Sequence, residues 1–367
     1  MNQAAARRTA LYDEHRKLGA RMVEFGGFEM PVQYASILKE HDAVRHRAGL
    51  FDLSHMGQFR MEGAQVAAWA DTLTTNPVAT MKPMQARYNI FCNERGGAHD
   101  DTIFYRLPDD RWLLVVNASN ASKMWSLLHE HPSDGARLTN RHGEDALIAI
   151  QGPASVAMLQ PHADVDLAGM RYYFCAEGEI EGVPALIART GYTGEDGFEI
   201  FVDGAFASNI WDVLLRRHGR EGLEPCGLGA RDVLRLEAGM PLYGHELTEE
   251  ITPVQAGQKW VVKLSKPAFT GREALAAQIE RDDYPRIVGL TMAGRAPARE
   301  GYAVFAGERR AGEVRSGSFA PSVGGGTNVA TALVGRESAT IGTKLAVEIR
   351  GTRHDATVVP LPFYKRS

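Results

Sequence analysis

The chain has 367 residues, of which 44% are hydrophobic and 23% are charged, and its formal net charge is -4. This length and composition suit a folded protein of two or three domains and exclude wholesale disorder. A charge so close to neutral gives no general electrostatic reason to bind nucleic acid or a membrane surface. We therefore expect neither as a partner.

The cysteines and the N-terminal sequence indicate in which cellular compartment the protein is expected. Cys92, Cys175 and Cys226 are far apart and form no C-x-x-C pair. Because three thiols cannot all pair within one chain, we expect buried, reduced cysteines in a reducing compartment. The charged N-terminal sequence is followed by no apolar signal region, and no run approaches the roughly 20 apolar residues of a membrane span. These observations favour a cytoplasmic location.

Hydrophobic periodicity predicts alternating helices and strands over the first 240 residues. The expected helices are 37–46, 64–73, 119–129, a helix after Asp203 as its candidate cap, and 228–238. The expected strands are 87–92, 102–107, 112–116, 146–150, 184–189 and 198–202. Asn93 to Gly97, between the first two of these strands, is expected to form a hairpin-like connection.

The pattern changes near Tyr284, after which short strands alternate with turn residues. These strands are expected at 287–292, 302–305, 312–315, 329–334, 345–349 and 357–359, with Gly324 to Gly326 as a loop between two of them. This spacing is typical of a small β-barrel or sandwich. We therefore expect a domain boundary between Lys266 and Pro285.

Several common motifs are absent. Gly227-Leu228-Gly229 lacks the third glycine of a dinucleotide-binding turn, and His245-Glu246 lacks the following histidine of a zinc protease helix. The histidine pairs do not have the i, i+4 spacing that would face one metal ion from a helix. We therefore expect no metal.

Polar and aromatic residues instead collect at predicted strand ends and tight turns. Three stretches stand out: Gly96 to Asp101, Arg189 to Glu199 and Cys226 to Asp232, with Asn117 directly after an apolar strand. Adjacent acids such as Asp100 and Asp101 more often form a solvated turn than a catalytic pair. Glycine-rich turns are mostly structural, so residue chemistry alone leaves both interpretations open.

Together with supporting stretches, these residues resemble the aminomethyltransferase family, the T-proteins of the glycine cleavage system. The resemblance runs from Leu11-Tyr12 to Pro362-Phe363-Tyr364. It includes Phe25 to Pro31, Phe51 to Gly57, Gln151-Gly152-Pro153, Arg235 to Gly239, Phe269 to Leu275 and Ser316 to Pro321. No single stretch is specific, but their order and spacing cover essentially the whole chain.

The resemblance implies an α+β fold of three domains arranged as a cloverleaf around a central folate channel, with antiparallel sheets, helices and a C-terminal β-barrel. The first domain would combine 1–52 with 139–240 and bind folate. The second would combine 53–138 with 241–275 and hold the aspartate pair, and 276–367 would form the barrel.

The implied reaction moves a one-carbon unit from the aminomethyl-loaded dihydrolipoyl arm of H-protein, the partner, to tetrahydrofolate. Its products would be 5,10-methylenetetrahydrofolate and ammonia. The carbon arrives already activated and folate supplies the nucleophilic nitrogens, so the protein mainly positions both and manages charge.

The resemblance also assigns site residues. Asp101 would orient the folate nitrogens and stabilise developing positive charge, with Asp100 supporting it. Glu199 would accept hydrogen bonds from the pterin edge, and Arg231 would contact folate. Tyr88, Asn117, Tyr172, Tyr173, Tyr192 and Tyr364 would complete the folate site, and Ser54, His55 and Met56 would border the entrance for the lipoyl arm.

Alternatives remain for some of these residues. Arg231 could instead pair with Asp232 or Glu237, and His55 could be a packed core histidine. Ala98-His99 departs from the usual apolar pair before the two acids. His99 could point to solvent or perturb the charge of the acids.

Rival functions on the same fold also remain. One is the folate domain of a dimethylglycine- or sarcosine-oxidising enzyme. Another is a folate-dependent demethylase, and a third is a non-catalytic folate-binding protein.

Overall fold

The computed structural model describes residues 5–133 and 135–366. Chain contacts divide it into two compact units. Unit 1 contains the N-terminal segment up to Trp69 together with Val78–Tyr88 and Thr102–Asp232. Unit 2 contains Ala70–Pro77, Asn89–Asp101 and the chain from Val233 onward. The three-domain division expected from the sequence stays a prediction.

A six-stranded sheet forms the centre of unit 1, with strand order β11-β12-β13-β10-β4-β14. Its strands are β4 (Ala48–Asp52), β10 (Asp145–Gln151), β11 (Cys175–Ile180), β12 (Val183–Ala188), β13 (Gly197–Asp203) and β14 (Leu223–Pro225). Strands β4, β10 and β13 are almost wholly buried, and their sequences are correspondingly almost continuously apolar.

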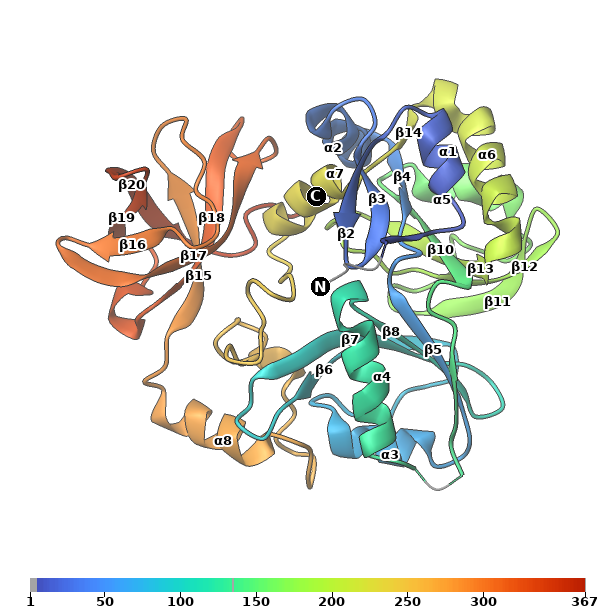
Figure 1. Cartoon of the computed structure of the whole chain (residues 1–367), viewed down its shortest axis with the longest axis horizontal. Coiled ribbons are helices and arrows are strands. Elements are labelled where there is room, and N and C mark those ends of the chain that lie inside the picture. Colours follow the sequence, from blue (N-terminus) through green and yellow to red (C-terminus); the bar gives the residue numbers. More distant parts are fainter. Residues whose placement is uncertain (1–4, 134, 367) are drawn as a thin grey trace. The chain divides into compact units, whose positions relative to one another are not determined.

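Helices cover this sheet because each presents an apolar stripe to it. Helix α6 (Ala207–His218) is labelled in Figure 1. It places Ile210, Trp211 and Leu214 in one core with Ile148 and Ile150 of β10. The other helices assigned partly or wholly to unit 1 are α1 (Tyr12–Lys17), α2 (Ile37–His46), α3 (Val66–Leu73), α4 (Ala121–Glu130), α5 (Ser155–Leu159) and α7 (Leu228–Glu237).

The start of α2 shows how local sequence sets an element. Ser36 has extended backbone geometry, and its hydroxyl accepts a hydrogen bond from the Lys39 N–H at 3.2 Å. Such a cap satisfies one of the amide groups left unpaired at a helix N-terminus. The helix has the bounds predicted from periodicity.

Two further sheets complete the N-terminal two thirds. A small one has the order β1-β3-β2 and a larger one the order β6-β7-β8-β5-β9. Their strands are β1 (Arg7–Arg8), β2 (Arg21–Phe25), β3 (Phe28–Gln33), β5 (Gly57–Glu62), β6 (Gln85–Cys92), β7 (Ala98–Arg106), β8 (Arg111–Val116) and β9 (Arg137–Asn140). The small sheet, β5 and β9 were not predicted from the sequence.

Unit 2 ends in a closed barrel with strand order β15-β18-β17-β16-β19-β20 (Figure 1, orange to red). The strands are β15 (Arg286–Met292), β16 (Ala303–Ala306), β17 (Arg309–Ala320), β18 (Thr327–Val334), β19 (Lys344–Ile349) and β20 (Thr352–Val359), and α8 (Arg272–Arg281) precedes them. Closure removes exposed sheet edges. The expected α+β fold with a C-terminal barrel is confirmed.

Two properties expected from the sequence can be compared with the described residues. Cys92, Cys175 and Cys226 are all free and buried, as expected. Within 5–133 and 135–366, no helix combines the length and hydropathy needed to cross a membrane.

Candidate functional site

Glu199 is a nearly buried carboxylate in the middle of β13, with only 7% of its surface exposed. Its Oε2 atom accepts two hydrogen bonds, from the Tyr105 hydroxyl at 3.1 Å and from the Thr190 hydroxyl at 2.5 Å. The edge of the Tyr105 ring packs against Phe201, with ring centroids 5.2 Å apart. Two neutral donors thus compensate a charge that would be costly to bury alone.

The turn before β13 folds over the side chain of Gln151. Gln151 donates from Nε2 to the Thr190 carbonyl at 3.0 Å and accepts at Oε1 from the Thr193 hydroxyl at 3.0 Å. A Cβ atom at Gly191 would lie 2.0 Å from Gln151 Oε1, and one at Gly197 would lie 2.5 Å from Nε2. The glycines are therefore needed for close approach to this side chain.

The other charged residues of this turn form ion pairs within unit 1. Arg189 contacts Asp196 with two hydrogen bonds, at 2.9 and 2.6 Å. Arg45 donates to the Glu195 carboxylate and to the Thr193 carbonyl, both at 2.7 Å. These pairs hold the backbone of the turn. Glu199 differs from the other acids of the stretch because hydroxyl groups position its carboxylate.

Arg231 and several of the predicted aromatic residues also lie in unit 1. The Arg231 guanidinium lies over the Tyr192 ring, 4.6 Å from its centroid, a cation–π contact. Tyr172 and Tyr173 form an edge-to-face pair with centroids 4.8 Å apart, and Tyr173 has a positive φ of 61°.

Two other predicted residues belong to the five-stranded sheet or directly follow one of its strands. Tyr88 is half-buried within β6, and Asn117 is half-buried directly after β8. The Ala86 N–H, close to Tyr88 in the chain, donates to the Tyr173 carbonyl at 2.9 Å. This bond connects the loop with the two tyrosines to the start of β6.

Ser54, His55 and Met56 follow β4. Ser54 is buried and accepts from the Leu147 N–H at 3.1 Å, while Met56 is half-buried. His55 is 2% exposed, and its ring makes an edge-to-face contact with the Phe25 ring, with centroids 5.6 Å apart. Among the residues that the structure describes, the Nδ1 atom of His55 has no hydrogen-bond partner. Burial, assisted by the charge of Arg231, lowers the pKa of His55 to about 4.

A buried network next to this segment was missed in the sequence. Asp52 Oδ2 contacts His15 Nε2 at 2.9 Å and accepts from the Thr9 hydroxyl at 2.7 Å, and Asp52 Oδ1 accepts from the Ser54 N–H at 2.8 Å. The Tyr34 hydroxyl contacts His15 Nδ1 at 2.9 Å. No motif or spacing in the sequence indicated that these segments meet.

The aspartate pair lies in unit 2, within β7 and not in a turn. The solvated turn, one of the two interpretations left open by residue chemistry, does not apply to this pair, because the strand begins earlier than the hydrophobic pattern suggested. Asp100 is fully buried and Asp101 is half-buried. Successive strand residues point to opposite faces, so the two carboxylates face different surroundings.

His99 and Tyr364 are the remaining residues of interest in unit 2. His99 Nδ1 lies 3.4 Å from a carboxylate oxygen of Glu249. Tyr364 is half-buried, and its N–H donates to the Glu237 carbonyl at 2.8 Å. Over the described ranges, no three side chains of His, Cys, Asp or Glu are grouped to hold a metal ion.

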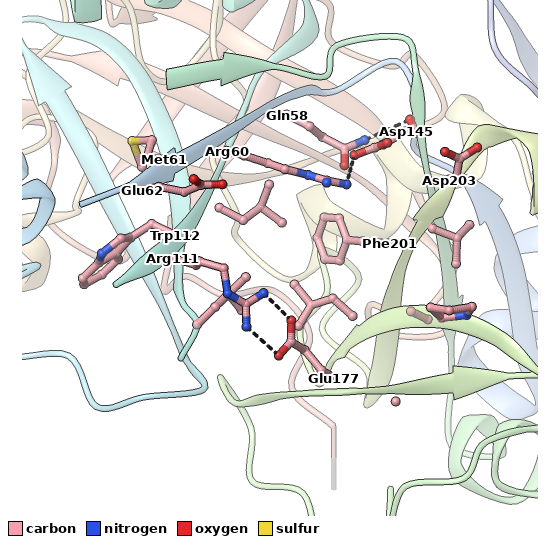
Figure 2. A pocket seen from close by; sticks show the side chains of 17 residues that line it. Gln58, Arg60, Met61, Glu62, Arg111, Trp112, Asp145, Glu177, Phe201 and Asp203 are labelled. Carbon is pink, nitrogen blue, oxygen red and sulfur yellow. Dashed lines mark hydrogen bonds and ion pairs between the residues drawn. The ribbon is translucent and has the colours of Figure 1, made fainter. Parts of the chain in front are cut away.

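Unit 1 also has a cavity of about 310 Å³ that contains none of the predicted site residues. Figure 2 shows the Arg60–Asp145 pair at one side and the Arg111–Glu177 pair at the other, with the Phe201 ring between them. Phe201 also contacts Tyr105. The cavity therefore shares the Phe201 side chain with the packing around Tyr105.

Comparisons with known proteins agree along the whole chain. Residues 11–266 match the GCVT N-terminal domain, and residues 286–365 match the glycine cleavage T-protein C-terminal barrel domain. The aminomethyltransferase of Desulfitobacterium hafniense (strain DSM 10664 / DCB-2) is 45% identical over 362 residues, and that of Geobacillus thermodenitrificans is 44% identical over 363 residues. These alignments cover 98% of this chain and 98% and 99% of the relatives.

A solved structure agrees with these matches. The glycine cleavage system aminomethyltransferase T from Bartonella henselae superposes with a TM-score of 0.91 at 34% identity, covering 98% of both chains. The fold is thus that of a one-carbon transferase of the glycine cleavage system. The chain belongs to the glycine cleavage T-protein family, the aminomethyltransferases. This membership confirms the family and the class of enzyme inferred from the sequence.

Sequence reasoning missed three residues around Glu199. Tyr105 lies near the end of β7, after Ile103 and Phe104, where the sequence has no motif. Thr190 and Gln151 belong to stretches used for the family resemblance, but nothing in the sequence showed that they contact each other or Glu199. The roles of the predicted site residues themselves stay predictions.

Proposed function

We propose that this chain transfers the one-carbon unit of aminomethyl-loaded dihydrolipoyl H-protein to tetrahydrofolate, releasing 5,10-methylenetetrahydrofolate, ammonia and the free dihydrolipoyl arm. Full-length similarity to aminomethyltransferases supports this reaction. The main structural support is Glu199, a buried carboxylate held by two hydroxyl donors. H-protein is the proposed partner. Three buried thiols support a reducing, cytoplasmic location.

The residues of unit 1 suit a flat heterocycle with N–H donors along one edge. A carboxylate such as Glu199 can accept hydrogen bonds from the aminopyrimidinone edge of a pterin. Aromatic side chains such as Tyr192 can pack against the faces of the ring, and Arg231 supplies a fixed positive charge beside Tyr192. We assign folate contact to these residues and to Tyr88, Asn117, Tyr172, Tyr173 and Tyr364.

In this proposal Asp101 acts on the nitrogens that attack the activated carbon. A half-buried carboxylate can orient an N–H group and stabilise the positive charge that develops on the nitrogen during attack. Buried Asp100 supports it from the adjacent position in β7. Ser54, His55 and Met56 are proposed to border the entrance for the lipoyl arm.

Substituting Asp101 tests the catalytic assignment. Asp101→Asn keeps the size of the side chain but removes its charge, so we expect turnover to fall about 10²-fold or more while folate still binds. Ammonia release from aminomethyl-loaded H-protein measures turnover, and isothermal calorimetry measures folate affinity. An unchanged rate would remove Asp101 from this role.

Substituting Glu199 tests the binding assignment. Glu199→Ala should weaken tetrahydrofolate binding by about tenfold or more, since a charged hydrogen bond contributes roughly 1.5–3 kcal/mol. The Michaelis constant for tetrahydrofolate should rise more than kcat falls. Equal affinity in the variant and the parent would contradict the assignment.

The same assay separates the proposal from a non-catalytic folate-binding function. Purified chain, loaded H-protein and tetrahydrofolate should release ammonia faster than the uncatalysed mixture. Folate binding without ammonia above that background would favour the non-catalytic alternative.

A further inference from the structure

The two oxygens of the Glu199 carboxylate have different surroundings. Both hydroxyl donors, from Tyr105 and Thr190, converge on Oε2. Within the part of the chain that the structure describes, Oε1 accepts no hydrogen bond, yet it is not one of the buried side-chain atoms without a partner. Oε1 therefore lies at the accessible surface, although Glu199 as a whole is 7% exposed.

We propose that Tyr105 and Thr190 are positioning residues that hold Glu199 so that Oε1 faces the N–H donors of the bound one-carbon acceptor. This inference rests on the proposed function, in which Glu199 binds the pterin edge. A side chain fixed in its binding orientation loses less conformational entropy when the ligand arrives. Because both donors bind Oε2, Oε1 is the oxygen that remains for the ligand.

Both donors are themselves fixed. Tyr105 is fully buried, its ring packs edge-on against Phe201, and burial beside Glu199 raises its pKa well above the usual range, so it remains a protonated donor. Thr190 is 1% exposed, and its carbonyl accepts from Gln151 Nε2 at 3.0 Å. The two hydroxyl oxygens lie 3.4 Å apart, so they approach Oε2 as neighbours.

A simpler role for the two hydroxyl groups would be to compensate the buried charge of Glu199. In that case their removal would change stability but not tetrahydrofolate binding. Thr190→Val retains the shape of the side chain and removes the donor, whereas Thr190→Ser retains the donor. Tyr105→Phe removes the second hydroxyl. Tyr34→Phe is the matched control, because it removes a tyrosine hydroxyl that contacts His15 elsewhere in unit 1.

The Michaelis constant for tetrahydrofolate, kcat and the unfolding midpoint are measured for each variant with loaded H-protein. We expect Thr190→Val and Tyr105→Phe to raise the Michaelis constant about tenfold with kcat changed less than threefold, and Thr190→Ser to restore it. Tyr34→Phe should change stability but not the Michaelis constant. Loss of stability in Thr190→Val without a change in the Michaelis constant would overturn the inference.

A double-mutant cycle then separates this inference from the function on which it depends. In the Glu199→Ala background, Thr190→Val should have no further effect on tetrahydrofolate affinity, because there is no carboxylate left to position. An equal effect in both backgrounds would show that Thr190 acts elsewhere and overturn the inference alone. If Glu199→Ala by itself leaves affinity unchanged, the assigned role of Glu199 fails together with that of its two donors.

Discussion

At the scale of single residues, Asn93 and Gly97 fix the connection that leads into the strand with the aspartate pair. Asn93 Oδ1 accepts from the N–H groups of Arg95 and Gly97, both at 3.0 Å, and its Nδ2 donates to the Glu249 carbonyl at 2.9 Å. A Cβ atom at Gly97 would lie 1.8 Å from that carbonyl oxygen. Only glycine permits this contact between two backbone segments.

We therefore expect Gly97→Ala to destabilise the protein by about 2–3 kcal/mol, because the two backbone segments must move apart. Urea unfolding measures the change. Gly219→Ala is the control: a Cβ atom there has nothing within 4 Å, so the free energy of unfolding should change by less than about 1 kcal/mol. Equal stability of the two variants would contradict the steric argument.

At the scale of elements, a buried ion pair joins α7 to the barrel within unit 2. Arg235 of α7 donates to Glu246 Oε2 at 3.1 Å and to the Ser316 hydroxyl of β17 at 2.9 Å. Thr331 of β18 donates to the other oxygen of Glu246. The side chains of Arg235 and Glu246 are 2% and 3% exposed, so each charge depends on its partners for compensation.

Arg235→Met should lower the free energy of unfolding by about 3–5 kcal/mol, because it leaves the buried Glu246 charge without its cation. The double variant Arg235→Met, Glu246→Gln should recover a large part of that loss, because no uncompensated charge remains. Thermal and urea unfolding of both variants and of Glu246→Gln complete the cycle. Simple addition of the two single effects would contradict the assigned coupling.

At the scale of the whole molecule, each unit contains a buried carboxylate whose pKa is below its usual range. Burial opposes ionisation of Asp52 in unit 1, but hydrogen bonds from His15, Ser54 and Thr9 outweigh it and lower the pKa. In unit 2, burial likewise opposes ionisation of Glu246, and the Arg235 charge and hydrogen bonds outweigh it. In both units the unfolded chain therefore takes up a proton at higher pH than the folded chain.

The sign of the pH dependence follows from this difference. The stability that these two groups contribute is complete above their unfolded pKa values, about 3.9 and 4.3, and is lost as pH falls through the lower folded values. Asp52→Asn should therefore lower stability at pH 7 and flatten the decline below about pH 4. Urea unfolding from pH 3 to pH 7 checks this, and parallel curves for variant and parent would contradict it.

The sequence by itself determined the family, the class of reaction, the bounds of helix α2 and the presence of a C-terminal barrel. These features depend on local periodicity and on ordered motifs, which a linear chain records directly. It did not determine that Asp100 and Asp101 lie within a strand, because strand bounds depend on pairing with neighbours.

Only the tertiary structure decided which side chains surround Glu199. Tyr105 is 94 positions away in the chain, and Gln151 contacts Thr190 across 39 positions. Such contacts depend on strand register and on the packing of separate segments, and neither leaves a pattern in local sequence. The sequence therefore proposed Glu199 as a site residue from its motif, whereas the hydroxyl groups that hold it were visible only after the chain had folded.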